Sequence, residues 1–264
     1  MKKNLRFVIA AAFAVLLFFG CKKSTIENIV SNVLDINETQ LVQNAGLNPN
    51  GAIKVEGKYL IEGDLLLSAD ELSNMSGNNG PKLIVANSEQ YRTTNLVTGL
   101  PRNINVSYTG SNTSLSNAVD AAIARYNAQN LLLHFYRVTS GADINVTTVK
   151  NANYIASSGF PTGGNPYGSV VYNLRYINIG TNTVTSVMAH ELGHCIGFRH
   201  TDYMDRSYSC GGSYSNEGAS TVGAIWISGT PTGPDADSWM LACIGSGVDR
   251  PFNANDRTAL SYLY

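Results

Sequence analysis

Charged residues are scarce in this sequence and make up only 14 % of its 264 positions. Lysine and arginine together number 18 against 19 acidic residues, so the formal net charge is -1. There is no basic patch, which argues against a nucleic-acid-binding protein, and no acidic tail is evident. The linkers are instead rich in Asn, Ser, Thr and Gly. This composition suits the polar, uncharged loops of an exported protein.

Long apolar runs are equally scarce, because the only one spans residues 7–19, directly after three basic residues. It is too short to cross a membrane comfortably, so residues 1–20 are predicted to be a secretory signal peptide. The small residue before Cys21 resembles a bacterial lipoprotein processing site, although Phe18 stands where leucine is usual. We expect Cys21 to be lipidated, with plain secretion as the alternative. Lys22 favours an outer-membrane or cell-surface location, with release after processing still open.

Cysteines are also few, and three remain once Cys21 is assigned to the lipid. In an oxidising compartment an odd number implies one disulfide and one free thiol. Cys195 falls on an apolar stripe and is expected to be a buried small side chain. We expect a disulfide between Cys210 and Cys243, with one that uses Cys195 as the alternative. None of the three has the surroundings of a nucleophile.

Histidine is also scarce, with four in the chain, and three of them lie in the stretch from His190 to His200. The pattern is HExxHxxGxxH. On a helix, His190 and His194 project from one face, one turn apart, and can bind one metal ion. His200 would lie roughly 9 Å further along a continued helix. The helix is therefore expected to end at Gly197, where a left-handed glycine reverses the chain and returns His200 to the metal.

Three neutral imidazoles leave one position of a tetrahedral zinc ion open, which is typical of catalytic rather than structural sites. Glu191, beside the first histidine, is the candidate general base. It would take a proton from the attacking water while the zinc polarises a carbonyl group. The alternative is a buried helix whose histidines have no function. It requires five fixed positions to match by chance and is not favoured.

The stretch from His190 to Asp202 resembles the metzincin zinc peptidases, and within them the HEIGH metallopeptidases, which include protease B-like bacterial enzymes. The resemblance implies an α+β catalytic domain with a twisted mixed sheet, a long active-site helix and an irregular lower subdomain. It also implies a Met-turn, which Met240 in Ser238-Trp239-Met240 supplies, as an apolar floor beneath the imidazoles. Some relatives have a tyrosine zinc ligand two residues later. Here that residue is Ala242, so no such switch exists.

Residues 21–100 are predicted to form a separate N-terminal region, and residues 101–264 the catalytic domain. A helical pattern covers Ile26 to Leu34, and a strand-like stretch covers Tyr59 to Ser68. Within the latter, Glu62-Gly63-Asp64 resembles a prosegment motif of astacin-type metzincins, in which the aspartate occupies the open zinc position and keeps the enzyme latent.

The alternative for Asp64 is an ordinary Gly-Asp hairpin turn. If latency holds, a cut in the polar stretch from Ser88 to Pro101, near Arg92 or after Arg102, would activate the enzyme. Such a cut would also free the catalytic part from its lipid.

Alternation and helical periodicity predict the remaining elements. The metzincin resemblance also implies an antiparallel edge strand within residues 154–180 that lines the cleft, and such an edge can bind an extended peptide as an added strand. Asn182 or Thr183 is expected to cap the active-site helix. The predicted elements are strands at 104–108, 131–138, 143–149, 168–172 and 176–179, a helix at 115–126, and a terminal helix after Asn253.

Beyond His200, Asp202 is a candidate to bond a ligand histidine and fix its tautomer, with loop capping as the alternative. Tyr203, Tyr208 and Tyr214 are candidates to stabilise the oxyanion, with no basis for a choice among them. His134 is expected to be an ordinary strand residue.

The sequence therefore predicts a monomeric, zinc-dependent endopeptidase, exported and anchored through a lipid, which acts on protein or peptide substrates. One catalytic Zn²⁺ is expected, and no structural Ca²⁺ is assigned. The alternative from another class is a surface binding lipoprotein that keeps the metallopeptidase fold and holds a ligand in its cleft.

Overall fold

A mixed five-stranded sheet forms the framework that carries the functional site. In the computed structural model, which describes residues 32–76, 90–218, 223–231 and 233–264, the strand order is β6-β5-β7-β9-β8. The first four strands are parallel to their neighbours, and β8 pairs antiparallel with β9 at one edge. The strands are β5 (Arg102–Tyr108), β6 (Leu133–Val138), β7 (Ile144–Val149), β8 (Ala156–Ser157) and β9 (Ser169–Asn173).

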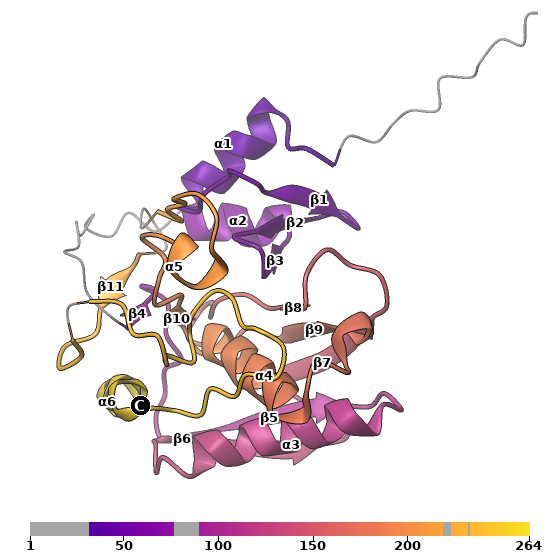
Figure 1. The fold of residues 1–264 in the computed structure, drawn as a ribbon, viewed down its shortest axis with the longest axis vertical. Coiled ribbons are helices and arrows are strands. Elements are labelled where there is room, and N and C mark those ends of the chain that lie inside the picture. The colour runs from indigo at the N-terminus through magenta and orange to yellow at the C-terminus, as the bar shows by residue number, and fades with distance from the viewer. Residues whose placement is uncertain (1–31, 77–89, 219–222, 232) are drawn as a thin grey trace, which may run out of the picture. The chain divides into compact units, whose positions relative to one another are not determined.

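Two helices lie side by side against this sheet (Figure 1). In α3 (Thr113–Asn127), Asn112 caps the first turn by accepting from the amide of Leu115, and the apolar face is buried as its periodicity predicts. In α4 (Thr181–Cys195), every residue from Thr183 onward is buried. The hydroxyl of Tyr126 on α3 donates to the carbonyl of Ala189 on α4 at 2.7 Å, which fixes the two helices in register.

The prediction for the segment before α4 was wrong in two respects. Residues 176–179 do not form a strand. Instead, the Asn173 side chain caps a short 3-10 helix, η1 (Leu174–Tyr176). The helix α4 begins at Thr181, and the residue at its N-cap is Gly180, which has φ of 117°. Glycine has no side chain, so α4 has no side-chain cap. Asn182 and Thr183 therefore lie inside the first turn and do not cap it.

The antiparallel edge strand lies within residues 154–180, as the resemblance implied. Residues 168–172 largely coincide with β9, which is an interior parallel strand, and the antiparallel edge is the two-residue strand β8. The turn-rich composition around Gly159 and Pro161 hides this short strand, because two residues show no periodicity.

The described N-terminal region starts with an isolated bridge between Val33 and Ile53. The helix predicted over residues 26–34 lies mostly outside the described residues, and its end was wrong. The first described helix, α1, begins only after Asp35, whose side chain accepts from the amide of Glu38 in a capping box. The elements are α1 (Ile36–Asn44), β1 (Ile53–Val55), β2 (Lys58–Ile61), β3 (Leu65–Leu67) and α2 (Ala69–Ser76).

The strand-like stretch 59–68 folds as an antiparallel hairpin of β2 and β3, with Glu62, Gly63 and Asp64 at its turn. Glu62 and Gly63 have φ of 53° and 88°, which reverse the chain within these residues. The side chains of Ile61, Leu65 and Leu67 lie in the same core as α3 and α4. The hairpin is thus packed into the main body of residues 32–264.

The part after α4 is mostly irregular, as expected, and is tied together by a disulfide between Cys210 and Cys243. Cys195 is a buried free thiol. Asn253 caps the terminal helix through a capping box with Asp256, in agreement with the sequence. A small antiparallel sheet has the order β10-β4-β11. The elements are β4 (Tyr91–Arg92), β10 (Phe198–Arg199), α5 (Ser207–Cys210), β11 (Ile225–Trp226) and α6 (Ala254–Leu263).

The predicted signal peptide and Cys21 lie outside the described residues. Within the described ranges, no helix is long and apolar enough to cross a membrane.

Candidate metal centre and active site

The three histidines of the motif come from α4 and the reversal that follows it. His190 and His194 lie one turn apart on α4, which ends at Cys195. Gly197 then adopts φ of 109°, and a Cβ there would lie 2.7 Å from the carbonyl oxygen of Asn95. Only glycine fits both constraints. The chain turns back through β10 and places His200 beside the other two rings, as the spacing predicted.

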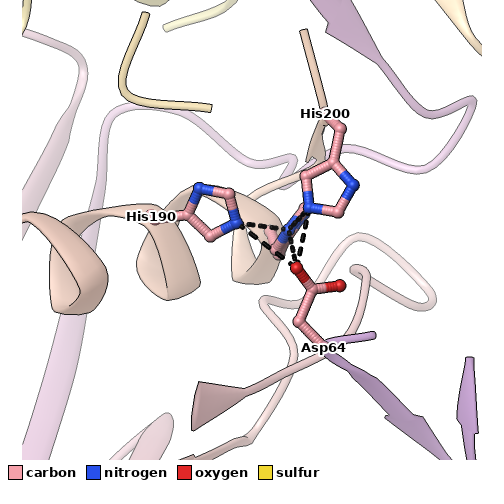
Figure 2. A group of neighbouring side chains, drawn as sticks. Asp64, His190 and His200 are labelled. Atoms are coloured by element: carbon pink, nitrogen blue, oxygen red, sulfur yellow. Dashed lines mark hydrogen bonds and ion pairs between the residues drawn. The ribbon is translucent and has the colours of Figure 1, made fainter. Parts of the chain in front are cut away.

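The imidazoles present their Nε2 atoms to one another. The distance from His194 Nε2 is 3.0 Å to His190 Nε2 and 3.2 Å to His200 Nε2. Figure 2 shows the rings of His190 and His200 directed toward the same point. All three residues are at least 92 % buried, with exposed fractions of 8 %, 1 % and 1 % for His190, His194 and His200.

The Nδ1 atom of each ring has a partner that fixes the orientation of the ring. His190 Nδ1 bonds the carbonyl of Trp239 at 2.9 Å, and His194 Nδ1 bonds that of Phe198 at 2.8 Å. His200 Nδ1 bonds the Glu217 carboxylate at 2.6 Å. A proton on Nδ1 leaves Nε2 free as a ligand atom, so these partners select the tautomer that binds metal.

Asp64 supplies a fourth oxygen from the hairpin turn. Its Oδ2 atom lies 2.8 Å from Nε2 of His200, 3.7 Å from that of His190 and 4.0 Å from that of His194. Figure 2 shows the carboxylate pointing directly at the rings. The other oxygen, Oδ1, is buried and has no hydrogen-bond partner among the described residues. Asp64 therefore lies in a hairpin turn and also contacts the histidines, because the turn directs its carboxylate at them. The two interpretations of Asp64 are compatible.

This donor set fits a tetrahedral zinc ion. Bonds of about 2.0 to 2.1 Å require ligand atoms about 3.3 Å apart, close to the nitrogen distances here. One atom from each of the four residues lies within 4.8 Å of the others. Burial lowers the pKa of His194 well below its usual value, helped by the neighbouring imidazoles, so this ring is neutral as a ligand must be.

Glu191 lies beside the cluster with an exposed fraction of only 2 %. The Ser158 hydroxyl, next to the sheet edge, donates to its Oε2 atom at 2.6 Å. Burial raises the pKa of Glu191 well above the usual range for glutamate, and the nearby Asp64 charge adds to this, whereas the bond from Ser158 opposes it. A carboxyl group with a raised pKa can both accept and return a proton.

Met240 packs against α4 at Gly193, inside the motif. A Cβ on Gly193 would lie 2.6 Å from Met240 Sδ and 3.1 Å from Trp239 Nε1, so the glycine makes room for both side chains. The Met240 carbonyl accepts from the Thr201 amide at 2.9 Å, which joins this turn to the residue after His200. Met240 itself is fully buried.

Two predictions about the residues after His200 need correction or narrowing. Asp202 does not contact a ligand histidine. It caps a loop, accepting from the Ala242 amide and the Ser209 hydroxyl. The bond to a ring nitrogen that was expected of Asp202 is made by Glu217, which contacts His200. Glu217 could not be identified from the sequence, because nothing in the spacing of that Gly- and Ser-rich segment marks it.

None of the three tyrosine candidates for the oxyanion lines the cavity beside the cluster. Tyr208 and Tyr214 are exposed, and Tyr203 packs against Tyr91. The tyrosine that lines this cavity, together with His190 and Glu191, is Tyr154, just before β8.

Buried charges surround the His200 side of the cluster. Arg199 Nη2 lies 2.9 Å from Glu62 Oε2 and 3.5 Å from Glu217 Oε2. Arg206 Nε lies 3.2 Å from Glu217 Oε1, and its Nη1 donates to the Glu62 carbonyl. This ion-pair network links the hairpin to the partner of His200.

A family model described as dual-action HEIGH metallo-peptidase matches residues 59–264 of the chain. Two solved structures of myroilysin are also similar to it, both with a TM-score of 0.43. One is 14 % identical and covers 64 % of this chain and 82 % of that chain, and the other is 15 % identical and covers 65 % and 86 %. No curated protein matches the sequence.

Glu217→Gln is expected to weaken zinc binding about 10- to 100-fold, because the neutral amide no longer supports the His200 ring with a charge. Competition with a chromogenic chelator measures the affinity, and circular dichroism checks the fold. Glu56→Gln, at an exposed residue, is the matched control. Equal zinc affinity in wild type and Glu217→Gln would contradict the assigned role.

Proposed function

We propose that this chain, which belongs to the dual-action HEIGH metallo-peptidase family, is a zinc-dependent endopeptidase that cleaves protein and peptide substrates. The observation that carries the proposal is the convergence of three Nε2 atoms, with His194 at 3.0 and 3.2 Å from the other two, beside a buried glutamate. His190, His194 and His200 would hold the ion. Met240, which packs against α4 at Gly193, would be the Met-turn residue of the family pattern.

The bound zinc would supply a Lewis acid that polarises the scissile carbonyl and lowers the pKa of the attacking water. Glu191 then acts as the general base. Since Ser158 holds Oε2, the Oε1 atom is left to take the proton and later deliver it to the leaving amine.

The sheet edge offers the place for an extended peptide. At present β3 lies along it: the Ser158 amide donates to the Asp64 carbonyl at 2.9 Å, and the Leu66 amide donates to the Ser158 carbonyl at 3.0 Å. These are the backbone groups that a substrate strand would use. Because Ser158 also holds Glu191, a peptide bound here would lie next to the catalytic carboxylate.

The same contacts support latency. The hairpin places Asp64 Oδ2 at 2.8 Å from His200 Nε2 and covers the edge with its backbone. A carboxylate is a competent zinc ligand and would take the coordination position that the reaction needs. We therefore propose that the region from residue 21 to about residue 100 acts as an inhibitory prosegment, and that residues 101–264 contain the catalytic machinery.

The contacts around Gln90 lead us to propose a different cleavage site between the prosegment and the catalytic part. Arg92 lies in β4 and Arg102 in β5. A protease that cut the peptide bond beside either residue would first have to open a paired strand. Gln90 is fully buried and bonds Ser238 and Asp256. These contacts favour a cut before Gln90, which would leave β4 with the catalytic part.

Glu191→Ala should lower the rate of casein digestion about 10²- to 10⁴-fold, because the general base is lost while all three histidines remain. The measurement is proteolysis by the zinc-loaded, activated protein, with zinc content determined in parallel. A strong chelator should abolish wild-type activity, and added zinc should restore it. Full activity in Glu191→Ala would reject the role, and a zinc-loaded wild type that cleaves nothing would favour the binding-lipoprotein alternative.

Asp64→Ala in the full-length chain should raise basal peptidase activity about tenfold or more, since a larger fraction of molecules has the open zinc position. Asp70→Ala, at an exposed aspartate on α2, is the matched control. Initial rates on a quenched-fluorescent peptide measure the effect. Unchanged basal activity in Asp64→Ala would count against latency through this residue.

We also propose that residues 1–20 direct export and that Cys21 carries a lipid anchor, supported by the apolar run and the small residue that precedes the cysteine. Incorporation of labelled palmitate should occur in wild type and disappear in Cys21→Ser. Labelling that persists in that variant would exclude Cys21 as the anchor.

A further inference from the structure

A cavity of about 220 Å³ opens beside the cluster, with His190 and Glu191 in its wall. This volume is several times the roughly 30 Å³ that one water occupies in the liquid, so it can take a side chain. Val187, Leu241 and Ile244 contribute apolar surface. The cavity would therefore receive a substrate side chain immediately next to the bond that is cut.

Arg250 is the unusual member of this wall. It is partly buried, and its Nη1 atom donates to the Cys243 carbonyl at 2.7 Å. Among the residues that the structure describes, no carboxylate lies within ion-pair distance of its guanidinium, whereas Arg125, Arg199 and Arg206 each have at least one. Four of its five N–H donors remain for another partner.

The backbone that carries Arg250 is held firmly. Its amide donates to the Ser186 hydroxyl on α4 at 2.9 Å, and that hydroxyl donates to Asp249 Oδ1 at 2.9 Å. Arg125 on α3 lies 2.6 Å from the same Asp249 oxygen. The chain thus fixes a cationic side chain at the cavity instead of leaving it on a mobile loop.

The charge on Arg250 is only partly compensated. Burial lowers the pKa of Arg250. The negative charges of Asp202, Asp237 and Asp256 raise this pKa, although none of the three carboxylates bonds the guanidinium. An arginine remains charged in proteins, so the partly buried guanidinium is best satisfied by a carboxylate, which it can bind through two parallel hydrogen bonds. Arg206 lines the same cavity, but its guanidinium is paired with Glu217, which leaves Arg250 as the cation available to a substrate side chain.

We propose that Arg250 makes this cavity select an acidic side chain, aspartate or glutamate, at one of the two substrate residues that flank the scissile bond. The inference rests on the proposed peptidase function and names its substrate class. Removal of Asp64 with the prosegment strengthens the selection, because Asp64 is the carboxylate of the hairpin that lines the same cavity.

The test uses the zinc-loaded full chain, activated by limited proteolysis, on two pairs of peptides, one pair for each position that flanks the scissile bond. The two peptides of a pair are identical except for Glu or Gln at that position, and the pair with the larger Glu/Gln difference identifies the residue that the cavity receives. In that pair, wild type should cleave the Glu peptide with kcat/KM about tenfold or more above the Gln peptide, the scale of a charge-assisted hydrogen bond. Arg250→Ala should abolish this ratio, and Arg250→Glu should reverse it toward a Lys peptide. Arg175→Ala, at an exposed arginine, should keep it.

Using the Glu/Gln ratio makes the result independent of how much of each variant is folded. Equal rates on the two peptides of both pairs in wild type, or an unchanged ratio in Arg250→Ala, would overturn the proposal. If casein is cleaved in a Glu191-dependent manner but no acidic preference exists, the inference alone fails and the proposed function stands.

A second readout needs no turnover and covers the case in which nothing is cleaved. In the full-length Asp64→Ala chain, millimolar N-acetylglutamate amide should shift the Arg250 Nε–H resonance in a ¹⁵N NMR spectrum, and N-acetylglutamine amide should not. The resonance is identified by its absence in Arg250→Ala. Equal shifts with both amides, or none with either, would overturn the acidic selection.

Discussion

The fixed orientation of three imidazole rings is the constraint on which the remaining structure depends. Each ring is held through Nδ1 by a different segment: the turn before Met240, the strand after Gly197, and the irregular segment that contains Glu217. Moving any of these segments would rotate one Nε2 atom away from the common point. The region after α4, which has little regular structure, is therefore required as much as the helix. Its disulfide and its contacts with Gly193 hold it in place.

The parts of the site that could be predicted are those whose geometry is local. The spacing of His190, Glu191 and His194 on one helix, and the reversal at Gly197, follow from helix geometry and glycine conformation alone. Likewise, a seven-residue strand and an amphipathic helix can be recognised from their periodicity. Ser158, Glu217 and Arg250 could not be found this way, because each reaches the site through the tertiary fold from a segment without periodicity. The two-residue strand β8 was missed for the same reason.

Errors also arose where two local interpretations competed. Asp202, two residues after the last histidine, is equally suited to bonding a ring or capping a loop, and only tertiary contacts decide in favour of the loop. At Asp64 the two interpretations proved compatible, since a hairpin turn is what directs the carboxylate at the histidines. The ion pairs of Glu62 with Arg199, and of Glu217 with Arg199 and Arg206, join the same turn to the support of His200. Removing one member of such a buried network usually costs more than the network contributes.

The packing of the hairpin into the main core has a consequence for how the protein is made. Leu60, Ile61, Leu65 and Leu67 are all at most 5 % exposed, and three of them share one apolar cluster with α3 and α4. A chain that lost this segment would present the surface beneath it to water, at a cost of about 25 cal/mol per Å² uncovered. If residues 21–100 act as the proposed inhibitory prosegment, the full-length chain is the form in which collapse is most favourable, and removal of the segment would uncover the catalytic groove at a cost in stability. The proposed inhibitory segment would then also serve as a template for the folding of the catalytic part.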